Sequence, residues 1–128
     1  MSIHIQAAMR IVCGFSVALT ATAARSQTQF DGDYWGEFTL TRIIGQSCSR
    51  PAPGTVRRLS IRNSEVSYMY NREQNTVLTG RVDSAGAFTA SGYLRSGLVQ
   101  MVGRVQGLDL KANMQSPECL YSFQGKKQ

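Results

Sequence analysis

The feature that most constrains the fold is an alternation of apolar and polar residues with a period of two. In "YWGEFTLTRII", residues 34–44, Tyr34, Phe38 and Leu40 share one phase, while charged and hydroxyl side chains take the other. Similar segments recur along the chain, and no window holds the 3.6-residue period of an amphipathic helix. Successive side chains of a strand point to opposite faces, so each segment predicts a strand with one buried face. We therefore expect an all-β protein.

Turn-forming residues separate the segments at regular intervals. Eight strands are expected, over residues 34–44, 56–62, 65–70, 76–82, 87–94, 97–105, 108–114 and 119–123. Tight turns are expected at Asn63-Ser64, at "DSAG" and at Gln106-Gly107. Three hairpins between an opening and a closing strand favour an up-and-down antiparallel meander, and eight strands suffice to close a small barrel. A two-sheet β-sandwich is the alternative.

The apolar phase defines an expected inner face. Its members are Tyr34, Phe38, Leu40, Leu59, Ile61, Val66, Tyr68, Leu78, Val82, Phe88, Leu94, Met101, Val105, Leu108, Leu110, Tyr121 and Phe123. Small residues interleave at the same phase: Gly80, Ala90, Gly92, Gly103 and Ala112. We interpret them as kinks that let a small barrel curve tightly. The alternative is interior room for an apolar ligand.

The N-terminal residues are typical of a secretory signal peptide. Arg10 precedes a 13-residue apolar run, which is followed by small residues. A membrane span needs about 20 apolar residues, so the run is short for an anchor. We expect cleavage after Ser26, with the cut after Ala23 as the alternative, and an exported protein, periplasmic or secreted. The mature chain, residues 27–128, is expected to be one domain without a transmembrane span.

Cleavage would change the inventory of reactive and charged side chains. Cys13 and the single histidine, His4, would be lost, which leaves Cys48 and Cys119. Two cysteines in an exported chain predict one disulfide. Arg10 and Arg25 would be lost as well, so the mature chain carries 12 basic and eight acidic residues and a net charge of +4.

The missing residue types exclude most catalytic chemistry. Without histidine there is no Ser-His-Asp triad, no Cys-His pair and no imidazole metal site. No nucleotide-binding or metalloprotease motif occurs either. Paired carboxylates could still act in a glycosidase-like way, but the acidic residues fall at turns and strand ends. We expect no enzyme, no metal and no cofactor.

The basic side chains gather on the phase opposite the core. Arg42, Arg62, Arg81 and Arg104 share that phase, and arginine binds phosphate and carboxylate groups bidentately. Solvation of the outer face is the plainer interpretation. Export makes nucleic acid an improbable partner, so a binding role would involve an envelope protein, a glycan or an anionic lipid.

Trp35 is the only tryptophan of the chain. Its phase puts it on the polar face, opposite to Tyr34. It would be buried if Gly36 marked a bulge, or if it covered a barrel end beneath residues 27–33. The third alternative is an exposed aromatic anchor for a partner. We favour the buried alternatives.

The opening "FDGDYWGEF", the two cysteines and the repeated "GRV" hairpins resemble small exported β-barrel proteins of Gram-negative bacteria. The chain is also loosely similar to the calycins, the lipocalin and avidin class, whose first strand carries a G-x-W motif. Here Gly32-Asp33-Tyr34 takes that spacing, and the tryptophan comes one residue later. The resemblance implies a barrel and no particular ligand residues.

The functional expectation is an exported, non-catalytic binding protein that engages an acidic protein, a glycan or an anionic lipid surface, with an inhibitor-like role as one version. Candidate binding residues are Trp35, Arg42, Arg62, Arg81 and Arg104. The alternative is a carrier of a small apolar ligand in a barrel cavity. An enzyme that uses carboxylates alone is a third and weaker alternative.

Overall fold

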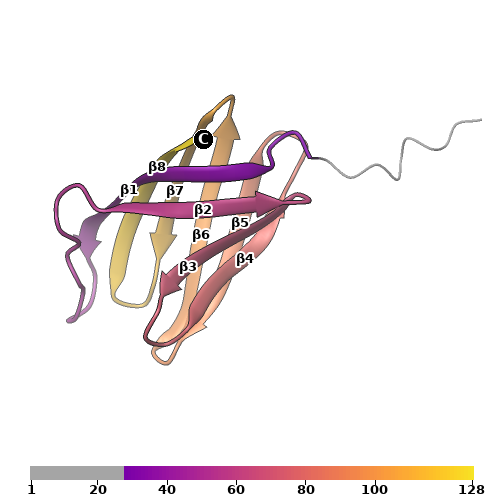
Figure 1. Cartoon of the computed structure of the whole chain (residues 1–128). Helices are drawn as coiled ribbons and strands as arrows, with labels where there is room; N and C mark the ends of the chain where they lie inside the picture. The colour runs from indigo at the N-terminus through magenta and orange to yellow at the C-terminus, as the bar shows by residue number, and fades with distance from the viewer. Residues whose placement is uncertain (1–27) are drawn as a thin grey trace, which may run out of the picture.

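A computed structural model describes residues 28–128, which form a closed barrel of eight antiparallel strands in up-and-down order, with each strand beside its neighbours in sequence (Figure 1). The strands are β1 (Gly32–Ile43), β2 (Val56–Arg62), β3 (Glu65–Asn71), β4 (Thr76–Val82), β5 (Ala87–Leu94), β6 (Gly97–Gln106), β7 (Asp109–Gln115) and β8 (Cys119–Lys127). The all-β meander and its closure are thus confirmed, and the sandwich alternative is not adopted. The signal peptide expected over residues 1–26 lies outside the described residues.

The core follows the period of two along every strand. Tyr34, Leu59, Tyr68, Met101 and Phe123 are among its fully buried side chains. One predicted core residue is wrong: Leu108 is 63% exposed. The turn is Gly107-Leu108 rather than Gln106-Gly107, because Gly107 adopts the positive φ of 62° that starts a tight hairpin turn. This shift moves Leu108 out of the strand.

The small residues of the inner face are in close contact with larger neighbours. A Cβ on Gly103 would meet the Phe88 ring and the Ala112 side chain. Phe88 and Ala112 are themselves buried. The glycine thus makes space for an aromatic ring of the core.

The two ends of the barrel differ. The closed end carries the start of β1, the end of β8 and three tight turns. Here the Asp31 carboxylate accepts hydrogen bonds from the backbone amides of Asn63 (2.7 Å) and Ser64 (3.0 Å), and the Tyr34 hydroxyl donates to the Phe30 carbonyl (2.7 Å). The opposite end, which we call the mouth, carries the long loop 44–55 and the turns 72–75, 95–96 and 116–118.

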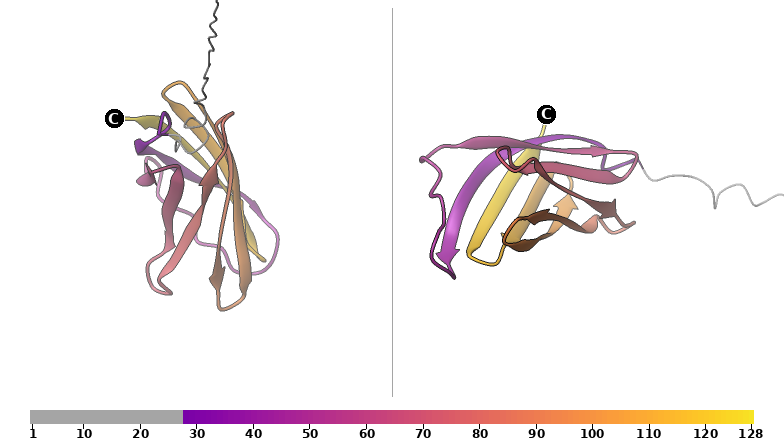
Figure 2. Two further views of the ribbon diagram at one scale, coloured as in Figure 1. Left: turned by 90° about the vertical axis from the view of Figure 1, so that its right-hand side faces the viewer. Right: turned by 90° about the horizontal axis from the view of Figure 1, so that it is seen from below.

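The closing seam joins β1 to β8 along nine residue pairs, from Tyr34–Lys127 to Ile43–Cys119. The two strands come from opposite ends of the described chain and run side by side in the right-hand view of Figure 2, in purple and yellow. Gly36 is required at this seam, because a Cβ there would overlap the backbone of Gln124 and Gly125. The pairing is irregular at Leu40/Arg42, and not at Gly36.

The seam between β2 and β3 is different, since only four residue pairs join these strands. Pairing begins at the Asn63-Ser64 turn and ends at Leu59–Tyr68. Beyond that point β2 and β3 diverge, as Figure 1 shows. Residues 56–58 of β2 and 69–71 of β3 have no partner across this boundary, which we call the open seam.

Candidate functional site

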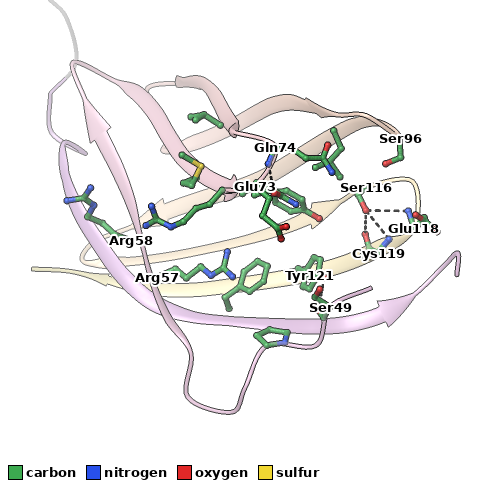
Figure 3. Close-up of a pocket in the computed structure, with 18 of the residues that line it drawn as sticks. Ser49, Arg57, Arg58, Glu73, Gln74, Ser96, Ser116, Glu118, Cys119 and Tyr121 are labelled. Atoms are coloured by element: carbon green, nitrogen blue, oxygen red, sulfur yellow. Dashed lines mark hydrogen bonds between the residues drawn. The ribbon is translucent and has the colours of Figure 1, made fainter. Parts of the chain in front are cut away.

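A cleft of about 1180 Å³ occupies the mouth and continues into the open seam. All six residues of the open seam line it: Val56, Arg57, Arg58, Met69, Tyr70 and Asn71. Loop 44–55 and the three turns of the mouth supply the remaining rim. The cleft therefore connects the top of the barrel interior with the outer face of β2 and β3 (Figure 3).

The side chain of Arg57 points from β2 toward the barrel interior. It precedes the buried Leu59 and Ile61 by two and four residues on β2, so it shares their inward phase. Figure 3 shows its side chain beside Tyr121 inside the barrel. Its guanidinium lies 4.2 Å from the centre of the Phe38 ring, a cation–π contact that tolerates partial burial.

No carboxylate among residues 28–128 forms an ion pair with Arg57. The two ion pairs of the described chain, Asp33–Arg62 (2.8 Å) and Asp109–Lys126 (2.6 Å), both lie at the closed end. A half-buried charge usually has a hydrogen-bonded partner, because removal from water is costly. Arg57 therefore offers donors to a group that residues 28–128 do not supply.

The hydroxyl of Tyr68 lies next to Arg57 and is buried without a hydrogen-bond partner, the one such side-chain atom in the described part of the chain. Its ring packs between Phe38 and Phe123, with centroids 6.3 Å and 5.6 Å away. Burial raises the pKa of this phenol, and the neighbouring Arg57 guanidinium acts in the opposite sense without forming a hydrogen bond of good geometry. The hydroxyl is thus a neutral donor at ordinary pH, next to an unpaired cation.

Aromatic rings form the walls around this pair. Tyr121 stacks on Phe38 with 4.5 Å between centroids, and Tyr70 meets Tyr121 edge-on at 6.0 Å. Burial raises the pKa of both tyrosines. The Tyr121 hydroxyl donates to the Ser49 carbonyl at 2.8 Å, which fixes this ring against loop 44–55.

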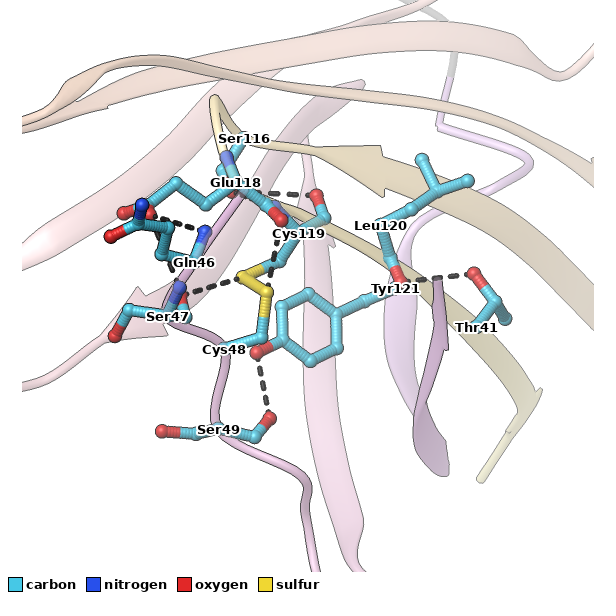
Figure 4. The surroundings of a disulfide bond; sticks show 10 residues. All are labelled: Thr41, Gln46, Ser47, Cys48, Ser49, Ser116, Glu118, Cys119, Leu120 and Tyr121. Atoms are coloured by element: carbon cyan, nitrogen blue, oxygen red, sulfur yellow. Dashed lines mark hydrogen bonds between the residues drawn. A yellow bond between two sulfur atoms is a disulfide. The ribbon is translucent and has the colours of Figure 1, made fainter. Parts of the chain in front are cut away.

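The disulfide between Cys48 and Cys119 anchors that loop, as predicted, with 5.7 Å between the Cα atoms (Figure 4). Glu118 adds a second attachment: its carboxylate accepts from the Gln46 and Ser47 amides, and its carbonyl accepts from the Ile44 and Gly45 amides. The rim of the cleft is therefore held in place, which lowers the entropy lost on binding.

The charge of the cleft lining is positive. Arg57, Arg58, Arg72 and Arg95 face only two carboxylates, Glu73 and Glu118. The Glu118 carboxylate already accepts two backbone amides. The cleft therefore favours an anionic ligand.

The structure separates the predicted binding residues. Trp35 lines the cleft, 42% exposed, with the Arg58 guanidinium 5.8 Å from its ring. Our preference for a buried Trp35 is wrong: β1 keeps strict alternation through Gly36, and its one irregularity comes at Leu40/Arg42. Arg42, Arg62, Arg81 and Arg104 are exposed outside the cleft, and Arg62 is paired with Asp33.

Sequence reasoning missed Arg57 and the Tyr68 hydroxyl. The signal was available for Arg57, which continues the apolar phase of Leu59 and Ile61, but its position near a loop concealed it. Nothing in the sequence indicates that the Tyr68 hydroxyl lacks a partner, since that depends on where β2 and β3 separate.

Comparisons of the chain with protein-family models, with curated proteins and with solved structures found no match. Residues 28–128 contain no cluster of side chains suited to hold a metal ion. No helix in this part of the chain is long and apolar enough to cross a membrane. The disulfide is compatible with an exported protein.

Proposed function

We propose that the chain is an exported, non-catalytic binding protein, and that its cleft holds an anionic group of the ligand at Arg57. The observation that carries this proposal is a juxtaposition within the described residues: a half-buried guanidinium without an ion-pair partner lies beside a buried hydroxyl without a hydrogen-bond partner. A buried unpaired polar group costs about 1–3 kcal/mol. A carboxylate or phosphate oxygen in the cleft would accept from Arg57, and we expect the Tyr68 hydroxyl, which is buried and does not itself line the cleft, to reorient toward that group when it enters.

The aromatic walls favour a ligand whose anionic group is attached to an apolar or planar part. Phe38 and Tyr121 present stacked rings beside the guanidinium, and the ring of Trp35 lies at the outer end of the cleft. An acidic protein, a glycan and an anionic lipid all carry suitable groups. Binding should weaken as salt rises, because the rim arginines are exposed.

The test is a titration of the labelled protein with benzoate and with inorganic phosphate at low salt, followed by NMR. We expect shifts at the Arg57 side-chain N–H and at residues that surround Tyr68, and a weaker effect for phosphate, which lacks a ring. Arg57→Met should abolish the shifts, while Arg81→Met, which removes an exposed arginine outside the cleft, should not. Equal binding by both variants, or no binding of either anion, would refute the proposal.

A carrier of an apolar ligand in the barrel has less support. Phe88 fills the space beside Gly103, and the Phe123 ring does the same beside Gly125. The cleft offers a hollow of its own, but four arginines and six serines line it. A thermal shift with fatty acids that persists in Arg57→Met would favour the carrier.

A further inference from the structure

The open seam has a property that the anion site alone does not use, namely unpaired backbone at the edge of a sheet. Arg62 and Glu65 flank the two-residue turn and form the first pair of the β2–β3 hairpin. In an antiparallel hairpin the backbone groups of alternate residues face the partner strand. Counting back from Arg62 by twos, the N–H and C=O groups of Arg58 and Val56 face β3. No residue of β3 pairs with them.

Barrels normally have no free edges, because an exposed row of backbone donors and acceptors invites another strand to pair with it. The boundary between β4 and β5 illustrates the usual solution. Its ladder also stops early, at Thr79–Ser91, but the Thr76 hydroxyl then donates to the Tyr93 carbonyl at 2.7 Å and the strands stay together. The open seam has no such bond in the described structure, and the cleft lies between the two strands instead.

The edge of β2 is the better template of the two. β2 keeps a regular register with β1 through Arg58–Trp35, Arg57–Gly36 and Val56–Glu37. The facing end of β3 is irregular, since its pairing with β4 shifts between Met69 and Asn71. An incoming strand would therefore find straight backbone on β2 and a bulged one on β3.

We propose that the open seam binds an extended acidic segment of a partner protein, which pairs with the edge of β2 and places a glutamate or aspartate opposite Arg57. This inference rests on the proposed anion site. Residues directly opposite each other on paired strands lie on the same face, so the acidic side chain enters the cleft beside Arg57, which lines it. The residues on either side of it pair with Arg58 and Val56 through backbone hydrogen bonds.

Side-chain chemistry on the outer face is consistent with this occupant. Val56 is 57% exposed and Trp35 is 42% exposed, so the outward side chains of the segment meet apolar surface. Arg58, Arg72 and Arg95 at the same cleft attract further acidic residues. Strand addition of this kind draws affinity from backbone hydrogen bonds and specificity from alternate side chains.

The experiment uses blocked pentapeptides of the sequence Thr-Val-Glu-Val-Thr, titrated into the protein with its disulfide intact. Binding should slow hydrogen exchange at the amides of Val56 and Arg58, which face the open edge. Replacing the central glutamate of the peptide by glutamine should weaken binding about tenfold, the cost expected for losing a charged hydrogen bond. Benzoate, titrated in parallel, reports the anion site separately.

N-methylation of the peptide tests the backbone pairing. Methylation of the two valines removes donors that face β2, so we expect binding to be lost. Methylation of the glutamate removes a donor that faces away from β2 and is the matched control. Loss at the valines alone supports the proposal, while no loss at either position, or equal loss at both, overturns it.

The remaining outcomes are also informative. If benzoate binds and the glutamate peptide does not, the anion site stands and strand addition is wrong. If neither binds, both proposals fall together. If vesicles of anionic lipid bind the wild type but not Arg57→Met, and the peptide binds neither protein, the partner is a membrane surface and the peptide proposal is refuted.

Discussion

The closing seam and the open seam differ in a way that their places in the chain would not suggest. β1 and β8 come from opposite ends of the barrel sequence, yet they pair along nine residues. β2 and β3 are joined by a two-residue turn, yet they pair along only four. Extending a hairpin costs little loop entropy, whereas joining distant strands costs more. The β2–β3 pairing, which costs less loop entropy, is incomplete, whereas the β1–β8 pairing, which costs more, is complete.

The difference indicates that the closing seam stabilises the barrel, whereas the open seam leaves backbone and side chains accessible to a ligand. The closing seam is compact because Gly36 allows close approach of β8, and the disulfide reinforces its far end at Cys119. The open seam exposes backbone, and within residues 28–128 Arg57 has no ion-pair partner and the neighbouring Tyr68 hydroxyl has no hydrogen-bond partner. Unsatisfied groups of this kind cost stability, which is consistent with a functional reason to keep them.

Removal of the disulfide should have the largest effect on the closing seam. The bond spans 71 residues, and in the chain-entropy model replacing Cys48 and Cys119 by serine lowers the free energy of unfolding by about 4 kcal/mol. Urea denaturation of the variant and of the oxidised protein measures the difference. Reduced wild-type protein should match the variant. A loss below about 1 kcal/mol would show that β1 and β8 hold together without it.

Gly36→Val should be the next most damaging change. The new side chain would overlap the backbone of Gln124 and Gly125, so β8 must move away, and we expect a loss of about 3 kcal/mol. Thr39→Val, at an exposed position of the same strand, is the control and should change stability little. Equal unfolding midpoints for the two variants would mean that β8 can move away from residue 36 without loss of stability.

Tyr68→Phe should act in the opposite direction. It removes the buried unpartnered hydroxyl and keeps the ring between Phe38 and Phe123, so we expect a gain of about 1 kcal/mol. Benzoate binding should weaken in the same variant. A gain in stability with unchanged benzoate binding would show that the Tyr68 hydroxyl does not take part in binding the anion.

The variant should also resist alkali better. Because burial raises the folded-state pKa of Tyr68 above its usual value of 10.0, the unfolded chain releases this proton first, and the folded state loses stability as pH rises above 10. Phenylalanine cannot ionise. The decline in unfolding temperature above pH 10 should therefore be shallower in Tyr68→Phe than in the wild type.

The smallest effect is expected from Asp33 at the closed end. Hydrogen bonds from Ser60 and Arg62 hold the pKa of this carboxyl below its usual 3.8. A lowered folded-state pKa gives stability that is present above the usual value and is lost as pH falls through the folded one. Asp33→Asn should be slightly less stable at neutral pH, and this difference should shrink below pH 3.8. Thermal unfolding of both proteins across this pH range measures the difference, and a gap that stays constant down to pH 2.5 would contradict the prediction.

Local pattern predicted the strands and their order, because burial on one face imposes the period of two on every segment, and the count of two cysteines in an exported chain predicted the disulfide. It misplaced Leu108, since a one-residue shift of a turn is decided by which residue takes the positive φ. The pattern put Trp35 on the polar face, but we preferred a buried Trp35 through a bulge at Gly36 or a position at the barrel end; Gly36 instead allows close approach of β8. The open seam was not predictable: β3 alternates regularly through Tyr70, and only the barrel geometry ends its pairing.

The closing seam also bears on the order in which the chain folds. The hairpins β2–β3 through β7–β8 are local, whereas the contact between Tyr34 and Lys127 must wait for the two ends of the barrel to meet. Contacts of high sequence separation form slowly, so we expect closure by β1 to be the late step. An open precursor would then present the unpaired edges of β1 and β8, and early oxidation of Cys48 and Cys119 would shorten its lifetime.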